Sequence, residues 1–442
     1  MHNAFGGRIL ENVMRVYISL LALLAAMGPV TAKPIVTSSE ESAARICLAR
    51  HETPARIVQA CDSALLEADL THTQRADLMI ARGDGHIWQD QYNEAAASYR
   101  AATEIDPYEV EAWNGLGWAL WEAEGDQAAY DAFERSLAIE VSVQGLAGKA
   151  GTGRRLGTVT NADARQLLLS ALTIDPDYIW AVREVAWSHM DDNQPRTAIE
   201  HFNNALDIEP EDVNARYGLG RALLAIRETE VALETFNSVL ADAPDDFPTL
   251  VYRIIALRKL DRNAQALREA ERLISAYPDR VSGYVEKGQA LVGLERRAVA
   301  IATYVDAEAL LGPNNTLLYW HADALTIDGR FEEALTVIDR GLRLSGVDYS
   351  DHLLRSYIAL ELKDYSLARE AAKASLSFGV EDPWAHYYIA ITHIHDGETE
   401  FGLARFEQAV AAGLPSDRIG AFATELISAG QYVEAAQLRL RY

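Results

Sequence analysis

The stretch DVNARYGLGRALLAIRETEVALETFNSVLADAP, residues 212–244, contains two similar patterns separated by a short polar turn. In each pattern apolar residues recur every three or four positions, as they do on one face of an amphipathic helix. The stretch ends at Pro244, and another proline, Pro210, stands 34 residues earlier. Residues 212–244 therefore predict one helical hairpin, bounded by a signal that occurs more than once.

Prolines with this spacing divide much of the chain into segments of equal length. They stand at Pro107, Pro176, Pro210, Pro244 and Pro278, and the last four are each 34 residues apart. A fixed period of this length indicates a repeat array, in which one supersecondary unit is copied along the chain. Such an array replaces the three ordinary domains that a length of 442 residues would otherwise suggest.

Small residues align at one position when each unit is numbered from 1 to 34. The units begin at residues 76, 110, 145, 179, 213, 247, 281, 315, 349, 383 and 417. Position 20 is then occupied by Ala95, Ala129, Ala164, Ala198, Ala232, Ala266, Ala300, Ala334, Ala368, Gly402 and Ala436. We expect the two helices of each pair to approach closely there, because a longer side chain would separate them.

Position 24 is mostly large and apolar, and we expect it to fill the space between neighbouring units. Its aromatic members are Tyr99, Phe133, Phe202, Phe236, Tyr304 and Phe406. Position 8 is usually small, but it carries Thr152 and Ile254 in two of the units. These departures weaken individual units without removing the pattern.

This pattern resembles the tetratricopeptide repeat, which has a Leu-Gly pair and a tyrosine in its first helix, alanine and phenylalanine in its second, and then proline. Leu116-Gly117 and Leu219-Gly220 match the pair most fully. The resemblance covers residues 76–442, in about 10 to 11 units. It implies an all-α, right-handed superhelical solenoid of antiparallel helix pairs. Residues 33–75 are interpreted as a degenerate helical hairpin that precedes the solenoid.

A glycine-rich run, residues 145–157, raises the question of a phosphate-binding loop. The run fails as a P-loop because Lys149 is followed by Ala150, where Ser or Thr would hold magnesium, and because Val143 replaces the first glycine. In the repeat numbering the same run falls where a first helix should lie. We interpret it as a glycine-diluted helix or the remnant of one, and we expect no cofactor.

The N-terminus has the pattern of an export signal. Arg15 precedes the apolar run VYISLLALLAAMGPV, which is too short to span a membrane, and small residues lead up to Ala32. We expect residues 1–32 to be a signal peptide, cleaved after Ala32, and the mature chain to lie in the bacterial periplasm without a membrane span. An uncleaved anchor is the alternative.

Two cysteines, Cys47 and Cys61, form the one possible intramolecular pair. Thr53 and Pro54 between them predict a helix start, so the cysteines lie on two antiparallel helices at similar distances from the turn. In an oxidising compartment a disulfide there would stabilise the fold by about 3 kcal/mol. Two free buried thiols are the alternative.

Charge and motifs restrict the possible functions. Forty Lys and Arg face 65 Asp and Glu, and the formal net charge of −25 argues against nucleic acid as a partner. The densest group of possible metal ligands, His386, His393, His395 and Asp396, lacks the spacing of a metalloprotease helix. We therefore expect neither a metal site nor an enzyme.

The resemblance also implies that positions 2, 5, 6, 9, 12 and 13 of the first helices line a concave groove. Seven of the eight tryptophans map to these positions. The candidate binding residues are Trp118, Trp121, Trp180, Arg183, Trp187, Tyr217, Arg221, Tyr252, Tyr319, Trp320, Tyr357, Trp384 and Tyr387. Aromatic rings supply a large contact area with little loss of side-chain freedom. The alternative is that these rings pack between neighbouring units.

Together these features predict an exported scaffold or adaptor that binds another protein or a peptide in an aromatic-lined groove. Arg183 and Arg221 are candidates for holding an acidic group of that partner. The alternative function is a module that binds a polysaccharide or a small ligand, because tryptophan rings also stack on sugars. The sequence does not fix the oligomeric state.

Overall fold

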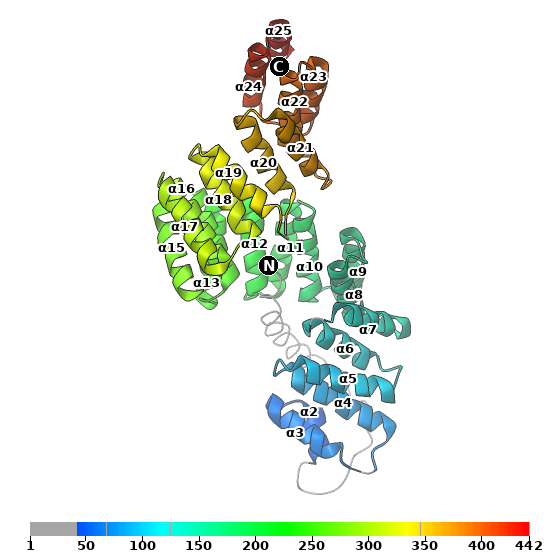
Figure 1. Ribbon diagram of the computed structural model, residues 1–442. Helices are drawn as coiled ribbons and strands as arrows, with labels where there is room; N and C mark the ends of the chain where they lie inside the picture. The colour runs from blue at the N-terminus through cyan, green and yellow to red at the C-terminus, as the bar shows by residue number, and fades with distance from the viewer. Residues whose placement is uncertain (1–41, 68, 124, 345, 442) are drawn as a thin grey trace. The chain divides into compact units, whose positions relative to one another are not determined.

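The chain is described by a computed structural model over residues 42–67, 69–123, 125–344 and 346–441. Over these ranges it forms 24 helices, α2 to α25, and no strand (Figure 1). The expected signal peptide, residues 1–32, lies outside the described residues.

The helices form two compact units, Met1–Pro244 and Asp245–Tyr442. The first unit contains α2 (Ala43–Ala49), α3 (Pro54–Ala64), α4 (His72–Ile87), α5 (Tyr92–Ile105), α6 (Val110–Glu122), α7 (Asp126–Ile139), α8 (Val143–Leu156), α9 (Asn161–Ile174), α10 (Ile179–Asp191), α11 (Pro195–Ile208), α12 (Val213–Ala225) and α13 (Thr229–Asp242). The second contains α14 (Phe247–Lys259), α15 (Asn263–Ala276), α16 (Val281–Gly293), α17 (Arg297–Leu311), α18 (Asn315–Ile327), α19 (Phe331–Gly341), α20 (Tyr349–Glu361), α21 (Tyr365–Leu376), α22 (Pro383–His395), α23 (Thr399–Ala411), α24 (Asp417–Ser428) and α25 (Tyr432–Arg441).

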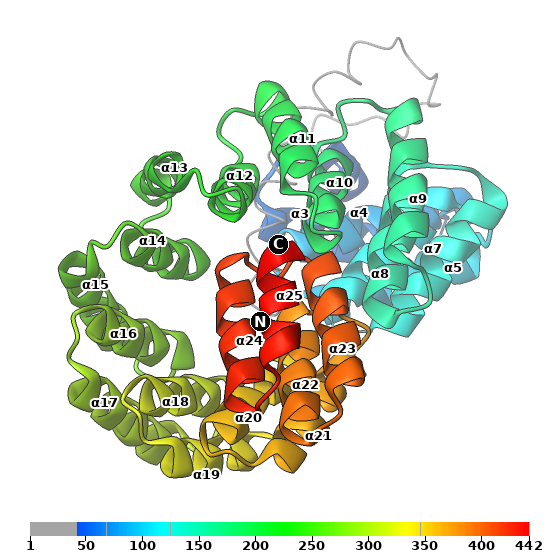
Figure 2. The ribbon, with the colours of Figure 1, turned by 90° about the horizontal axis from the view of Figure 1, so that it is seen from above.

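Within each unit, consecutive helices pair and the pairs follow one another in chain order (Figures 1 and 2). The even-numbered, first helices also contact the first helices of the next pair, as α6 contacts α8 and α18 contacts α20. No comparable contact joins successive second helices of the described residues. Each stack is therefore tighter on the side of its first helices, and we call that side the first-helix surface.

Helix starts follow the repeat numbering closely. From α10 onward, each first helix begins at the first residue of a predicted unit, and α6 does the same at Val110. The two exceptions are α4, which begins at His72, and α8, which begins at Val143. In both, a hydroxyl residue just before the helix caps it: Thr71 accepts a hydrogen bond from the Gln74 amide and Ser142 from the Gly145 amide.

The small residues at position 20 are buried between paired helices, as predicted, up to the last pair. Ala198, Ala232 and Ala266 are fully buried. In the last pair Ala435 is buried and Ala436 is exposed, so the predicted role of Ala436 is wrong. The reason is a shorter first helix: α24 has 12 residues where α22 has 13, and the second helix therefore begins one residue early.

Rings at position 24 pack against small residues at position 8. Phe133 is fully buried, and a Cβ added at Gly117 would lie 2.7 Å from its ring. The unit that begins at residue 247 reverses the sizes, because Ile254 at position 8 is buried and the residue at position 24 is Ala270. In this unit the large side chain therefore comes from position 8 instead of position 24, which keeps the interior filled.

The glycine-rich run forms a complete helix, α8, with caps at both ends. The Ser142 hydroxyl accepts a hydrogen bond from the Gly145 amide, and Gly157 ends the helix in the left-handed conformation with a φ of 70°. A Cβ at Gly148 would overlap the Phe133 ring, and one at Gly151 would overlap the Trp121 ring. The interpretation as a glycine-diluted helix is therefore confirmed, and the alternative of a helix remnant is wrong. The glycines allow rings from α6 and α7 to approach the α8 backbone.

The N-terminal hairpin consists of α2 and α3, which lie inside the predicted range 33–75. Cys47 and Cys61 are fully buried, and their sulfur atoms are 2.03 Å apart. Ile57 and Leu78 belong to the same apolar cluster, so the hairpin packs directly on α4. The bridge in the exported protein stays a prediction, which a thiol assay tests.

Candidate binding surface

All of the candidate residues lie on first helices. In the first unit α6 carries Trp118 and Trp121, α10 carries Trp180, Arg183 and Trp187, and α12 carries Tyr217 and Arg221. In the second unit α14 carries Tyr252, α18 carries Tyr319 and Trp320, α20 carries Tyr357, and α22 carries Trp384 and Tyr387. Each of these side chains is half-buried or buried, so the rings serve packing to differing degrees.

Three of the aromatic candidates are buried and cannot contact a partner in this arrangement. Trp180 is 5% exposed, Tyr217 3% and Tyr387 5%. Trp180 lies in an apolar cluster with α8 residues, while Tyr387 packs against the rings of Phe406 and Phe422. The prediction that these three residues line an open groove is therefore wrong, because they fill the contacts between successive pairs.

Arg183 is also buried, and it is used inside the chain. Its Nη1 lies 2.5 Å from Oδ2 of Asp212, which is fully buried. The other oxygen, Oδ1, accepts a hydrogen bond of 2.7 Å from the Ala215 amide and so caps α12. Removing one partner of a buried ion pair leaves an uncompensated charge. Arg183 therefore holds α12 against α10 and is not an anchor for a partner's acidic group.

Tryptophans of the first unit form one cluster around α6. Trp118 stacks on Trp121 with their ring centroids 5.2 Å apart. Trp180 stands edge-on to Trp118 at 5.4 Å, and Phe133 does so at 5.2 Å. Trp180 therefore packs between units, which was the alternative to a binding role. Trp118 and Trp121 keep part of their surface exposed.

Three half-buried tryptophans are each covered by an arginine from the following pair. The guanidinium carbon lies 5.0 Å from the ring centroid in each case. The pairs are Trp121 with Arg155, Trp187 with Arg221, and Trp384 with Arg418. In all three the arginine follows its tryptophan by one repeat of 34 residues. These cation–π contacts join successive first helices along the surface.

Arg155 was not among the predicted binding residues, because its position in the repeat is not a groove position. A signal for it does exist in the sequence, namely an arginine one period after a tryptophan. Arg155 also pairs with Asp126 and donates a hydrogen bond of 3.2 Å to the Trp121 carbonyl oxygen. It therefore serves to join repeats as well as to cover a ring.

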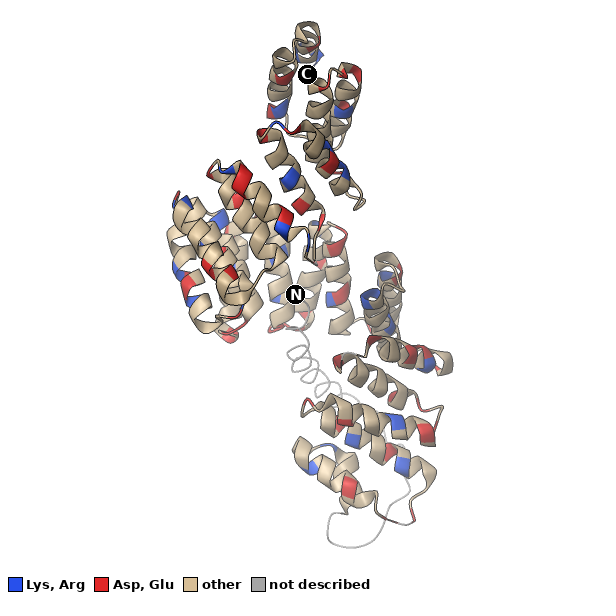
Figure 3. Ribbon diagram, viewed as in Figure 1, with Lys and Arg blue, Asp and Glu red and all other residues tan. Residues whose placement is uncertain are grey.

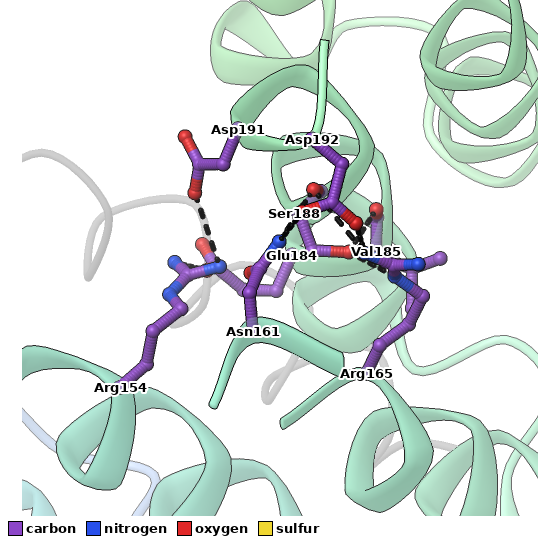
Figure 4. A network of polar contacts seen from close by, with 8 residues as sticks. All are labelled: Arg154, Asn161, Arg165, Glu184, Val185, Ser188, Asp191 and Asp192. Atoms are coloured by element: carbon purple, nitrogen blue, oxygen red, sulfur yellow. Dashed lines mark hydrogen bonds and ion pairs between the residues drawn. The ribbon is translucent and has the colours of Figure 1, made fainter. Parts of the chain in front are cut away.

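A polar network links α9 to α10 in the first unit (Figure 4). Arg165 on α9 donates from Nε to the Ser188 hydroxyl at 2.7 Å and pairs with Asp192. Asn161 donates hydrogen bonds to the Ser188 carbonyl oxygen at 2.8 Å and to Asp192 at 2.6 Å. These contacts fix the second helix of one pair against the first helix of the next.

The same arrangement occurs in the second unit, between α21 and α22. Arg369 donates from Nε to the Thr392 hydroxyl at 2.9 Å and pairs with Asp396. Arg165 and Arg369 occupy position 21, and their partners occupy positions 10 and 14 of the following pair. The network therefore recurs at two junctions between pairs, where it joins a second helix to the following first helix.

Charged residues are spread over the helices of both units (Figure 3). Several cations of the first-helix surface pair across successive helices: Arg154 with Glu184 at 2.7 Å, and Arg258 with Glu286 at 2.8 Å. Burial raises the pKa of Glu286, while the Arg258 guanidinium lowers it. The surface therefore offers few cations to an acidic partner.

No chemistry of the enzymatic kind stands out in the described residues. Lys149 lies 2.8 Å from Glu134 and over the Tyr130 ring, so its ammonium group is engaged within the chain. His386, His393 and His395 pair with separate glutamates. In the part of the chain that the structure covers, no group of three or more His, Cys, Asp or Glu side chains could hold a metal ion. None of the described helices has the length and apolar character needed to cross a membrane.

The paired helices and their interlocking small and aromatic residues define an all-α solenoid of stacked helical hairpins. Two models of the tetratricopeptide repeat match the sequence, one at residues 189–257 and the other at residues 80–140 and 285–349. The chain is a tetratricopeptide repeat protein. No curated protein sequence matches it.

Solved structures share the fold at low sequence identity. Yeast Tom70 has a TM-score of 0.53 at 11% identity, and the match covers 89% of this chain and 94% of that one. The Cut9-Hcn1 hetero-tetramer of the APC/C gives a TM-score of 0.50 at 12% identity, covering 91% of this chain and 86% of that one. At such identities the likeness concerns the fold alone.

Proposed function

We propose that the chain is an exported scaffold or adaptor that binds another protein, or a peptide segment of one, on its first-helix surface. The observation that carries this proposal is the concentration of half-buried aromatic side chains on successive first helices of a tetratricopeptide solenoid. Trp320, Tyr357 and Tyr252 belong to this set. Large rings that are already held in place lose little freedom when a partner covers them.

The second unit offers a continuous aromatic stretch over α20 and α22. Tyr357 stacks on Tyr388 with centroids 6.1 Å apart, and Trp384 lies 6.1 Å from the same Tyr388 ring. Burial raises the pKa of Tyr388 above its usual value. An extended segment could cross these rings and place alternate side chains between them.

A carbohydrate-binding role has less support. Sugar stacking requires an uncovered indole face, and the indoles of Trp121, Trp187 and Trp384 each carry a guanidinium at 5.0 Å. Within the described ranges, no group of side chains has been found that would support a catalytic role. A protein partner makes use of rings and charged edges together, and for this reason we favour it.

Site-specific photocrosslinking in the producing cell tests the proposal. A benzophenone amino acid would replace Tyr252 or Tyr357 on the first-helix surface, one at a time. The matched control in the same unit is Phe401 on the second helix α23, which is 67% exposed. We expect one shared crosslinked partner from the first two positions and none from position 401.

Two results would contradict the proposal. One is a set of crosslinks from position 401 equal to those from positions 252 and 357, which would place the contact elsewhere. The other is the absence of any crosslinked protein at all three positions. Recovery of the chain from the periplasmic fraction, with its N-terminus at Lys33, tests the export that the proposal includes.

A further inference from the structure

Negative charge gathers on the first-helix surface of the second unit, between α18 and α20. Asp323, on α18, is half-buried and accepts a side-chain hydrogen bond from Gln289. Burial raises the pKa of the Asp323 carboxyl, and the hydrogen bond from Gln289 lowers it. Among the described residues, no lysine or arginine forms an ion pair with Asp323.

A second carboxylate, Asp351, lies at the start of α20 and is 2% exposed. Its Oδ2 accepts hydrogen bonds from the Asp348 amide at 2.9 Å and from Asn315 Nδ2 at 3.1 Å. Its Oδ1 is buried and has no hydrogen-bond partner within the described ranges. A buried oxygen without a partner is unusual, because desolvation without a hydrogen bond costs free energy.

The negative charge of these acids acts on the pKa of the Tyr319 hydroxyl. Burial raises the pKa of its hydroxyl to about 12, and the nearby charges of Asp323, Asp351 and Asp348 raise it in the same direction. The surface around Tyr319 is therefore negative and only partly hydrated, which favours a positive group.

Aromatic rings flank these carboxylates. Tyr319 and Trp320 stand edge-to-face with centroids 5.0 Å apart, and Asp323 follows Trp320 by three residues on the same helix. Tyr357 occupies the position of Asp323 one repeat later. Trp187 and Arg221 occupy the same position in two successive pairs of the first unit, and the Arg221 guanidinium carbon lies 5.0 Å from the Trp187 ring centroid.

Trp320 differs from the three arginine-covered tryptophans in one respect. The residue one repeat after Trp121, Trp187 and Trp384 is an arginine, but the residue one repeat after Trp320 is Leu354. Leu354 cannot supply the guanidinium that those arginines supply, and the same holds for the residues one repeat after Trp88, Trp113, Trp118 and Trp180. Trp320 differs from those four in that Asp323, a carboxylate without an ion-pair partner among the described residues, follows it by three residues on the same helix.

We propose that Tyr319, Trp320, Asp323, Asp351 and Tyr357 form a subsite for one Lys or Arg side chain of an extended partner segment. We call these five residues the acidic-aromatic subsite. The guest's cation pairs with Asp323 and lies against Trp320, as Arg155, Arg221 and Arg418 lie against three other tryptophans. This inference rests on the proposed function and adds to it that the partner segment carries a positive charge.

Fluorescence anisotropy with a labelled peptide of alternating alanine and arginine tests the subsite on the full mature chain. The matched control peptide replaces arginine with citrulline, which keeps the shape and removes the charge. At about 0.15 M salt, where distant surface charges are screened, we expect only the arginine peptide to bind. Asp323→Asn should weaken that binding about tenfold, since a desolvated charge pair is lost.

Asp328→Asn is the control variant, because it removes the same charge from the exposed end of the same helix. We expect it to change the affinity by less than about twofold. Asp323→Asn should also melt no lower than the wild type, because it removes a desolvated charge that lacks a cation. A purely structural Asp323 would instead lower the melting temperature when it is replaced.

Equal weakening by the two variants would overturn the subsite, and so would equal binding of the citrulline peptide. Photocrosslinking distinguishes a failure of the subsite from a failure of the proposed function. If position 357 still crosslinks to that partner in an Asp323→Asn background with undiminished yield, the first-helix surface binds a partner without the subsite. If the peptide binds through Asp323 but no partner crosslinks, the scaffold function fails instead.

Discussion

At the scale of single residues, aromatic rings pack into the space that glycines leave because they have no side chain. Phe133 is fully buried between Gly117 on its own repeat and Gly148 on the next. Glycine ordinarily weakens a helix by about 1 kcal/mol relative to alanine. Here the missing side chain admits a whole ring, and burying a phenylalanine contributes about 1.5 to 3 kcal/mol. Burial of the ring is therefore of the same size as the loss of helix propensity at the two glycines and offsets it.

Gly148→Ala should destabilise the protein by about 1 to 3 kcal/mol, because the added methyl group would overlap the Phe133 ring. The matched control is Gly420→Ala on α24, where a Cβ meets no atom within 4 Å. That change should stabilise by about 0.5 to 1 kcal/mol through helix propensity. Urea denaturation of both variants measures the difference, and a stabilising Gly148→Ala would show that the ring contact is not tight.

Asp84 provides a pH-dependent test at the same scale. Burial raises the pKa of its carboxyl from the usual 3.8 to about 6, although Arg50 and the Tyr99 hydroxyl lower it. Arg50 Nη1 lies 2.9 Å from Asp84 Oδ2. The folded protein therefore keeps a proton between about pH 4 and pH 6 that the unfolded chain releases.

It follows that the free energy of unfolding should fall as the pH rises through this window, relative to the Asp84→Asn variant. The contribution is greatest below the unfolded pKa and is lost above the folded pKa. Thermal melts of both proteins between about pH 4 and pH 7 provide the measurement. A constant difference in melting temperature across the window would rule out a raised pKa at Asp84.

At the scale of elements, the N-terminal hairpin attaches to the first repeat by apolar and charged contacts together. Ile57 and Leu78 pack in one cluster, while Arg50 at the end of α2 reaches Asp84 on α4 and Glu111 on α6. The Arg50 to Glu111 distance is 3.2 Å. The hairpin is therefore held on α4 by an apolar cluster and by the ion pairs of Arg50.

Reduction of the Cys47–Cys61 bridge should release this hairpin first. A loop of about fifteen residues contributes about 3 kcal/mol in the chain-entropy account. Mass spectrometry after alkylation of the native exported protein should find no free thiol. Hydrogen exchange after reduction should rise in α2 and α3 and stay unchanged in α10. Two alkylated cysteines before reduction would show that the bridge is absent.

The helix pairs could be predicted from sequence because their signals are local and periodic. Ala198, Ala232 and Ala266 mark helix crossings, and each crossing requires a small residue whatever the neighbouring units contain. The end of the array was less predictable. Ala435 replaces Ala436 in the crossing because α24 is one residue shorter, and no periodic signal records a helix length.

Burial of the candidate residues could not be predicted from position alone. Tyr217 and Tyr319 share position 5, yet Tyr217 is buried and Tyr319 only half-buried, because their neighbours on the adjacent pairs differ. Arg183 was expected on the surface, but Asp212 in the loop before α12 binds it. The acidic residues around Tyr319 come from two different repeats. Positions within a single repeat therefore do not predict that these residues lie together.

At the scale of the whole molecule, the chain is a series of similar pairs arranged in two compact units. Each pair contacts its neighbours through the same few positions, and the remaining first-helix positions vary from pair to pair. In the first unit those positions are filled with stacked tryptophans and ion pairs. In the second they leave rings and carboxylates only partly covered. The units therefore differ in what they offer to a partner.

Hydrogen exchange of the chain with its crosslink-identified partner, bound and free, tests the proposed binding surface most directly. We predict that binding slows exchange in α16, α18 and α20, whose helices carry the acidic-aromatic subsite and its neighbours. Exchange in the second helices α17, α19 and α21 should change little. Protection confined to those second helices, with none in α18, would contradict the account.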